Sequence, residues 1–217
     1  MCTGMHVRRL RKAALFSIFM AAALLQMGCS THTFQVKYEP TREVVPSEGT
    51  EPLIAVGSLR DDRGTESAWL GAIRGGYGNP LKKLYSDQPI GSVVATAMAD
   101  ALQTRKLLAP PSSAVLRIEG SIAKLDCSYY FNREAHTHLL LNIVDTRSNA
   151  TLFSQTYKTD NKEGGVGAGI FGDVDHLAAF MQKTLNETID TALSDPALLT
   201  VLRQQPAKAS RATADRL

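Results

Sequence analysis

Two histidines at metal-ligand spacing, His136 and His138, are the side chains of this sequence that most suggest catalysis. Residues two apart in an extended strand share a face and lie about 7 Å apart, which two ligands of one metal ion can just span. Glu134 is the nearby carboxylate on that face, so another ligand would have to come from elsewhere in the chain. We favour the alternative that both imidazoles face solvent. A metal-dependent hydrolase built around them is kept as a less favoured hypothesis.

Residues 167–172, Gly-Ala-Gly-Ile-Phe-Gly, match the glycine spacing of a dinucleotide-binding fingerprint. That fingerprint follows a strand that opens a parallel crossover, whereas the strand before residue 167 is expected to close an antiparallel meander. The acidic residues about 20 positions later, Glu187 and Asp190, fall within a predicted helix. The pattern therefore predicts a glycine-rich linker, and we expect no cofactor.

Other nucleophiles and carboxylates lack the spacing that catalysis needs. Asp61 and Asp62 are consecutive, so their side chains point to opposite sides of an extended chain. Arg60 and Arg63 beside them suggest self-neutralising surface charge or turn capping. The chain has no serine elbow and no His-Glu-x-x-His sequence. Cys127 is expected to be a small buried hydrophobe. We therefore expect that the protein is not an enzyme.

Residues 60–87 have no clear period, yet they contain side chains of the types enriched in binding hot spots. Trp69, Arg74 and Tyr77 are the candidates for contact with a partner, and nearby glycines would let a partner approach the backbone. In the alternative, which we weigh more heavily, Trp69 and Ile73 fold back and plug one end of the core.

Residues 1–28 have the organisation of a secretory signal peptide. A basic cluster precedes residues 13–25, where Ser17 is the only polar side chain. As a helix this stretch would cover about 20 Å, too short for a bilayer core of about 30 Å. The basic residues are Arg8, Arg9, Arg11 and Lys12.

Removal of the signal peptide changes the net charge. The chain has 24 Lys and Arg against 21 Asp and Glu; without the four basic residues of the signal, 20 remain against 21, a net charge of −1. Without excess positive charge, the counterion release that drives nonspecific binding to nucleic acid has no source. Nucleic acid is therefore not an expected partner.

Residues 26–29, Gln-Met-Gly-Cys, resemble a bacterial lipobox, in which a signal peptidase cuts before an acylated cysteine. Gly28 and Cys29 carry the resemblance, while Gln26 stands where leucine is usual. The resemblance implies lipid attachment, palmitate included, at Cys29. Ser30 rather than Asp after the cysteine is similar to the pattern that sorts lipoproteins to the outer membrane of Gram-negative bacteria.

The mature chain divides into three parts. Residues 29–52 are polar with Pro and Gly, which predicts a lipidated tether with at most a short strand at residues 34–38. Residues 53–203 predict a single periplasmic domain. Residues 204–217 lack an apolar period and predict a disordered tail.

The periodicity of the domain predicts an α+β fold. A helix over residues 88–106 carries an apolar stripe, and Asp173 offers an N-cap to a second amphipathic helix. We expect an antiparallel or mixed sheet of about four or five strands with both helices packed on one face. Strands are expected at residues 53–57, 116–122, 136–143 and 150–159, and the stripe at Ile90, Val93, Val94, Ala97, Met98, Ala101 and Leu102.

The element order resembles that of the YajG-like bacterial lipoproteins. It comprises the lipobox, the apolar strand that reaches residues 58–63 (Ser-Leu-Arg-Asp-Asp-Arg), a helix, a β-meander that ends at the strand of Tyr157, and an amphipathic helix. The resemblance covers most of residues 29–202. It implies a small protein that is lipid-anchored in the outer membrane and faces the periplasm, with no catalytic residues to carry over.

Two further hypotheses concern function. In the first, the protein is a noncatalytic envelope lipoprotein that binds another periplasmic or outer-membrane component, with residues 60–87 as the contact surface. In the second, it is an auxiliary lipoprotein of an envelope lipid or solute transporter that holds an apolar ligand between helix and sheet.

Overall fold

The computed structural model of the protein describes residues 30–44, 53–164, 172–202 and 204. The predicted signal peptide, Cys29, residues 167–171 of the predicted linker and nearly all of the predicted tail lie outside the described residues. Within the described part of the chain, no helix has the length and apolar character needed to cross a membrane.

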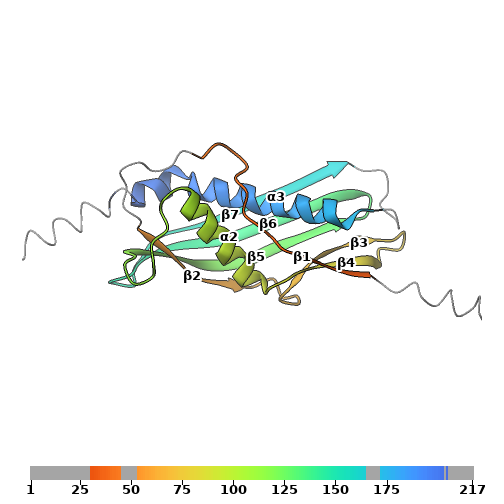
Figure 1. The fold of residues 1–217 in the computed structure, drawn as a ribbon, viewed down its shortest axis with the longest axis horizontal. Coiled ribbons are helices and arrows are strands. Elements are labelled where there is room, and N and C mark those ends of the chain that lie inside the picture. The colour runs from red at the N-terminus through yellow and green to blue at the C-terminus, as the bar shows by residue number, and fades with distance from the viewer. Residues whose placement is uncertain (1–29, 45–52, 165–171, 203, 205–217) are drawn as a thin grey trace, which may run out of the picture. The chain divides into compact units, whose positions relative to one another are not determined.

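A mixed β-sheet of seven strands is the framework of the described residues (Figure 1). Its order is β1-β4-β3-β5-β6-β7, and β2 also pairs with β5. The predicted α+β class is confirmed, whereas the predicted number of strands is too low. The strands are β1 (Ser30–Phe34), β2 (Ile54–Asp61), β3 (Trp69–Arg74), β4 (Pro80–Ser86), β5 (Leu116–Tyr129), β6 (Asn132–Asp145) and β7 (Thr151–Gly164).

β5 organises the sheet because both of its edges are paired. One edge pairs antiparallel with β6, which pairs antiparallel with β7, so the predicted meander is present. On the other edge β2 pairs in parallel with residues 116–122, and β3 pairs in parallel with residues 127–129. Of the two predicted alternatives, antiparallel or mixed, the sheet is therefore mixed.

β3 and β4 account for the strands that the sequence analysis missed in residues 60–87. Leu70, Ala72 and Ile73 of β3 are all fully buried. Since successive residues of a strand point to opposite faces, β3 is covered on both faces. A strand buried on both faces shows no alternation of apolar and polar residues, which explains why this segment has no period.

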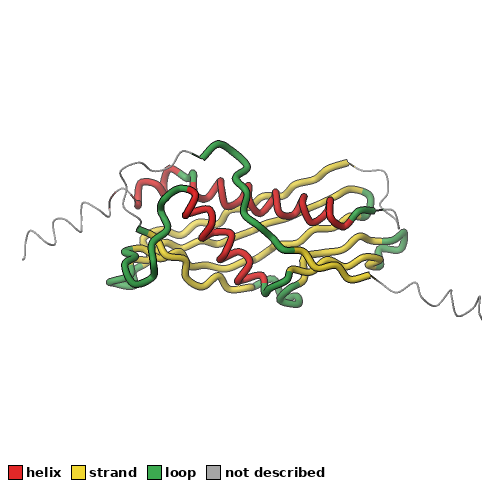
Figure 2. Tube along the Cα trace, viewed as in Figure 1, coloured by secondary structure: helices red, strands yellow, loops and turns green. Residues whose placement is uncertain are grey.

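Both predicted helices are present, and they lie on the same face of the sheet (Figure 2). α2 (Ile90–Thr104) buries the seven residues of the predicted stripe, and it is shorter than the predicted 88–106. α3 (Val174–Leu193) begins where predicted, because the side chain of Asp173 accepts a hydrogen bond from the backbone of Asp175 at 2.9 Å. The core lies between these helices and apolar side chains of the sheet, among them Ile118, Ile122, Leu139 and Leu141.

The segment after β1, residues 35–44, is packed against the helices, and we call it the strap (Figure 1). The backbone N–H of Lys37 donates to the side chain of Gln182 in α3 at 2.9 Å. Tyr38 is 9% exposed and belongs to the hydrophobic core. The described part of the predicted tether is therefore folded: β1 belongs to the sheet, and the strap belongs to the helical layer.

A buried carboxylate in α3 holds the strap. Asp190 is fully buried and forms an ion pair at 2.8 Å with Arg105, which follows α2 and is 6% exposed. The hydroxyl of Tyr38 donates to Oδ1 of Asp190 at 2.5 Å, and the backbone and hydroxyl of Thr41 donate to Oδ2 at 2.8 and 2.7 Å. Arg105 also donates to the Tyr38 hydroxyl at 2.9 Å. One carboxylate thus joins the strap to the ends of both helices.

Hydrogen bonding controls the ionisation of this carboxylate. Burial alone would raise the pKa of Asp190, but hydrogen bonds from Tyr38, Thr41 and Arg105 outweigh burial and hold this pKa below its usual value. A carboxyl group whose pKa is lower in the folded state stabilises the fold at pH values above its unfolded pKa of about 4. This stabilisation is lost as the pH falls through the folded pKa.

Replacing Asp190 should destabilise the protein strongly. We expect Asp190→Ala to lower the free energy of unfolding by about 3 kcal/mol at pH 7, because it leaves the Arg105 guanidinium buried without its counter-ion. Urea unfolding at pH 7 and at pH 3 measures the effect. The difference in the free energy of unfolding between variant and wild type should be smaller at pH 3. Lys162→Gln removes an exposed ion pair with Glu134 and is the control, for which near wild-type stability is expected. A similar loss in both variants would contradict a special role for Asp190.

Candidate functional site

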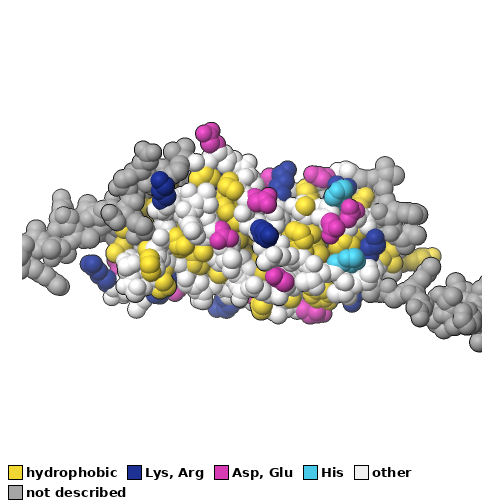
Figure 3. Space-filling model, viewed as in Figure 1, with side chains coloured by type: hydrophobic (Ala, Val, Ile, Leu, Met, Phe, Trp, Pro, Cys, Tyr) yellow, Lys and Arg dark blue, Asp and Glu magenta, His cyan; other side chains and the backbone are white. Residues whose placement is uncertain are grey.

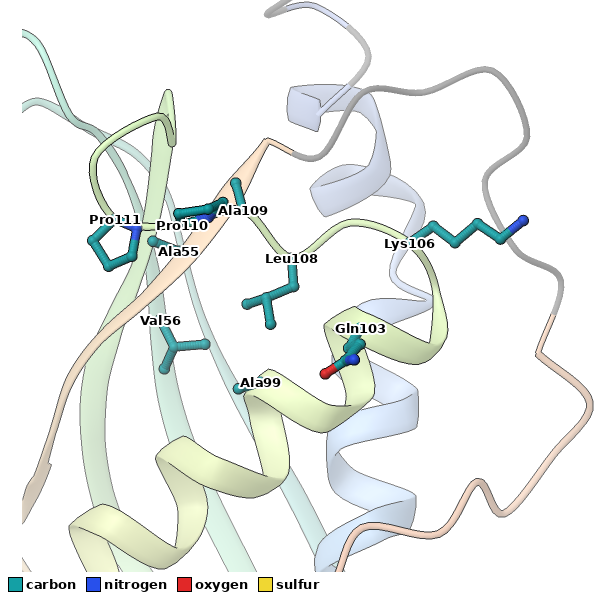
Figure 4. Close-up of a pocket in the computed structure, with 9 residues that line it drawn as sticks. All are labelled: Ala55, Val56, Ala99, Gln103, Lys106, Leu108, Ala109, Pro110 and Pro111. Carbon is teal, nitrogen blue, oxygen red and sulfur yellow. The ribbon is translucent and has the colours of Figure 1, made fainter.

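An open apolar groove lies between α2 and the start of β2 (Figure 4). Its volume is about 550 Å³. Val56 of β2, Ala99 of α2 and Leu108 face one another across it, and Pro110 closes one side (Figure 4). Lys106 directs its ammonium group away from the groove (Figure 4). A concave apolar surface of this size suits part of an apolar ligand.

Backbone pairing fixes the position of this groove. After α2 the chain turns back, and Leu108 forms a parallel bridge with Ile54 at the start of β2. The N–H of Ala109 donates to the carbonyl of Ile54 at 2.8 Å, and the N–H of Ile54 donates to the carbonyl of Leu107 at 3.1 Å. The segment after α2 thus covers the edge of β2 only near Ile54, and the groove opens beside Val56.

The three candidate partner-binding residues do not form one patch. Trp69 begins β3 and packs edge-to-face on Tyr85 of β4, with ring centroids 5.3 Å apart. Arg74 ends β3, and its guanidinium donates to the carbonyl of Gly78 at 3.0 Å within the β3–β4 turn. Tyr77 lies in that turn and is fully exposed. β3 therefore separates Trp69 from Tyr77. Of the two residues predicted to plug the core, Ile73 is fully buried and Trp69 is half-buried.

His136 and His138, the two candidate metal ligands, both contact a carboxylate that the sequence analysis missed. Asp160 of β7 lies opposite His136, and its carboxylate pairs with Nδ1 of His136 at 2.5 Å and with Nε2 of His138 at 3.0 Å. The hydrogen bond with His136 is the main cause that holds the pKa of Asp160 below its usual value. Glu134, the predicted further ligand, forms an ion pair with Lys162 at 2.7 Å instead.

This cluster is a cross-strand polar contact on the sheet. Within residues 30–44, 53–164, 172–202 and 204, no group of three or more His, Cys, Asp or Glu side chains could hold a metal ion. Sequence reasoning could not find Asp160, because only the β6–β7 register brings it between the two imidazoles.

The other candidate groups for chemistry are engaged in the fold. Arg60 pairs with Asp62 at 2.6 Å on the surface, as predicted. Arg63 pairs with Asp61 at 2.8 Å, but its side chain is only 4% exposed, so this pair neutralises charge inside the fold rather than on the surface. Cys127 is 3% exposed, as predicted, and burial raises the pKa of its thiol far above the ordinary value. A thiol that stays protonated is a poor nucleophile.

A close backbone approach explains this burial of Cys127. Gly71 of β3 has φ +155°, and a Cβ atom there would lie 1.9 Å from the carbonyl oxygen of Cys127. Only glycine lets β3 come this close to β5. The result is a packed strand junction that encloses the Cys127 thiol.

Comparison with known proteins identifies a shared fold but no family. No protein-family model and no curated protein matches the chain. A crystal structure of a DUF330 protein from Xanthomonas campestris is similar with TM-score 0.56 and 13% identity, covering 82% of this chain and 99% of that one.

Two further structures have TM-scores below 0.5. The PelC dodecamer protein of Paraburkholderia phytofirmans gives 0.41 with 12% identity, covering 68% of this chain and 90% of that one. Lipoprotein GNA1162 of Neisseria meningitidis gives 0.25 with 10% identity, covering 62% of this chain and 95% of that one. The fold that this chain shares is therefore that of the Xanthomonas DUF330 protein.

Proposed function

We propose that the protein is a noncatalytic envelope lipoprotein, anchored through lipid on Cys29 in the outer membrane, whose domain binds another envelope component in the periplasm. One observation carries this proposal: residues 26–29, which resemble a lipobox, are followed directly in the sequence by a strand of the folded sheet. β1 begins at Ser30, the residue that follows the candidate lipidation site.

The fold supports an anchor that acts directly on the domain. Consecutive Cα atoms are 3.8 Å apart, so the first sheet residue lies one peptide unit from Cys29. β1 pairs with β4, and the strap is fixed to α3 through Asp190. A domain attached this closely is confined near the membrane, which raises its effective concentration toward membrane partners.

The polar groups of the domain support binding rather than catalysis. The paired Asp61 and Asp62, the pairing of Asp160 with two imidazoles, and the buried Cys127 leave these groups occupied in structural contacts. A general base or nucleophile needs a free, suitably placed group that can reach a substrate. Association with a partner needs no such group.

The lipid anchor is tested by labelling growing cells with palmitate. Wild-type protein should take up the label, and Cys29→Ala should lose the label and leave the membrane fraction, because the thioether cannot form. Cys2→Ala is the matched control, since Cys2 precedes the apolar stretch of the signal peptide, and it should label like wild type. Labelled Cys29→Ala protein would contradict the proposal.

The groove favours the second candidate function, the holding of an apolar ligand for an envelope transporter. Its facing residues, Val56, Ala99 and Leu108, are apolar and only partly covered by the fold. Burial of apolar ligand surface there would contribute about 25 cal/mol per Å². Several CH₂ groups of an acyl chain would thus be bound with useful affinity.

Filling the groove should abolish ligand retention. Ala99→Phe places a ring between α2 and β2, whereas Ala179→Phe places the same ring on an exposed position of α3. Native mass spectrometry of protein purified from envelopes should show an apolar adduct on wild type and on Ala179→Phe, and less of it on Ala99→Phe. Wild-type protein that carries neither lipid nor transporter subunits would count against this function.

A further inference from the structure

Two turns meet at one end of the sheet and bring three aromatic residues together. The β3–β4 turn holds Tyr77, and the β5–β6 turn holds Tyr130 and Phe131. The hydroxyl of Tyr130 donates to the carbonyl of Gly76 at 2.6 Å, which joins the turns. The rings of Tyr130 and Phe131 lie 4.1 Å apart between centroids. We call Tyr77, Tyr130 and Phe131 the aromatic tip.

The aromatic tip contains the exposed large hydrophobic side chains of the described residues. Tyr77 is 102% exposed and Phe131 is 62% exposed. Among the residues whose structure is described, no other large hydrophobic side chain is classed as exposed, and both stand at the same end of the sheet. Figure 3 shows apolar side chains that project at that end. Folding leaves these rings in water, so their exposure needs a reason other than core packing.

The strand that follows Cys29 starts at this same end. The N–H of Asp87, just after β4, donates to the carbonyl of Phe34, the last residue of β1, at 3.3 Å. β1 pairs with β4, and the last residues of the two strands are neighbours, so the two strands run in parallel. Their first residues are therefore also near each other (Figure 1). The start of β4 at Pro80 directly follows the β3–β4 turn. Thr31, at the start of β1, therefore lies close to the aromatic tip.

We infer that the aromatic tip inserts into the phospholipid leaflet that holds the lipid of Cys29. This inference rests on the lipid anchor of the proposed function. Tyr and Phe rings with an apolar body, and in Tyr a polar hydroxyl, suit the boundary between headgroups and acyl chains. The lipid and the tip then form two membrane contacts, which fix the orientation of the domain instead of letting it swing.

This orientation places the groove away from the membrane. β5 ends at the tip with Tyr129, and Val56 of the groove pairs with Ile118, eleven residues earlier. At about 3.3 Å per residue, the groove lies roughly 35 Å from the tip. The groove therefore opens toward the periplasm, where a soluble partner or a transporter subunit can reach it.

Fluorescence quenching by lipid tests the orientation in acylated protein. Trp69→Phe removes the only tryptophan of the chain, and Tyr77→Trp or Ser148→Trp then adds a reporter at the tip or in the β6–β7 turn. β6 has 14 residues, so these turns lie about 45 Å apart. Each variant, purified from envelopes, is reconstituted in phosphatidylethanolamine and phosphatidylglycerol vesicles whose acyl chains carry bromine.

Strong quenching of Tyr77→Trp together with background quenching of Ser148→Trp is the expected result. Background quenching of both reporters, in protein that still floats with the vesicles, would overturn the inference and leave the anchor in place. Equally strong quenching of both reporters would also overturn it, because the domain would then lie flat on the membrane. Protein that lacks acyl mass and fails to float would instead refute the anchor, and the inference with it. Emission of Tyr77→Trp that shifts with protein concentration in the absence of vesicles would assign the tip to contacts between copies.

Discussion

The fold depends on one buried carboxylate. Asp190 accepts hydrogen bonds from Tyr38, Thr41 and Arg105, which come from the strap and from the end of α2. A buried charge is tolerated only when its hydrogen-bonding sites are filled, so the strap is required for α2 and α3 to be stable in this arrangement. The N-terminal segment is therefore a structural part of the domain.

This constraint links the proposed membrane anchor to the surfaces proposed for binding. Among the described residues, β1 is the edge strand beside β4, and the strap continues from β1 to the helical layer. A pull on the proposed lipid anchor would therefore be resisted by the pairing of β1 in the sheet and by the Asp190 contacts of the strap. The aromatic tip and the groove lie at opposite ends of β5.

The sequence predicted the elements whose two faces differ. The stripe of α2 and the alternation at Ile118 and Leu141 are visible because one face is buried and the other is polar. β3 was missed because both faces are buried, and the strap was missed because Tyr38 and Asp190 are 152 residues apart. The site residues show a similar division. The burial of a single residue such as Cys127 was predicted correctly, whereas the groove and the Asp160 contacts depend on strand register and could not be predicted.

Hydrogen exchange of the strap in the purified protein tests the central claim most directly. The claim predicts slow exchange at the amide N–H groups of Lys37 and Thr41, which donate to Gln182 and Asp190, with protection similar to that within α3. Exchange at the rate of an unstructured chain would contradict it, and would mean that the segment after Cys29 is a free tether.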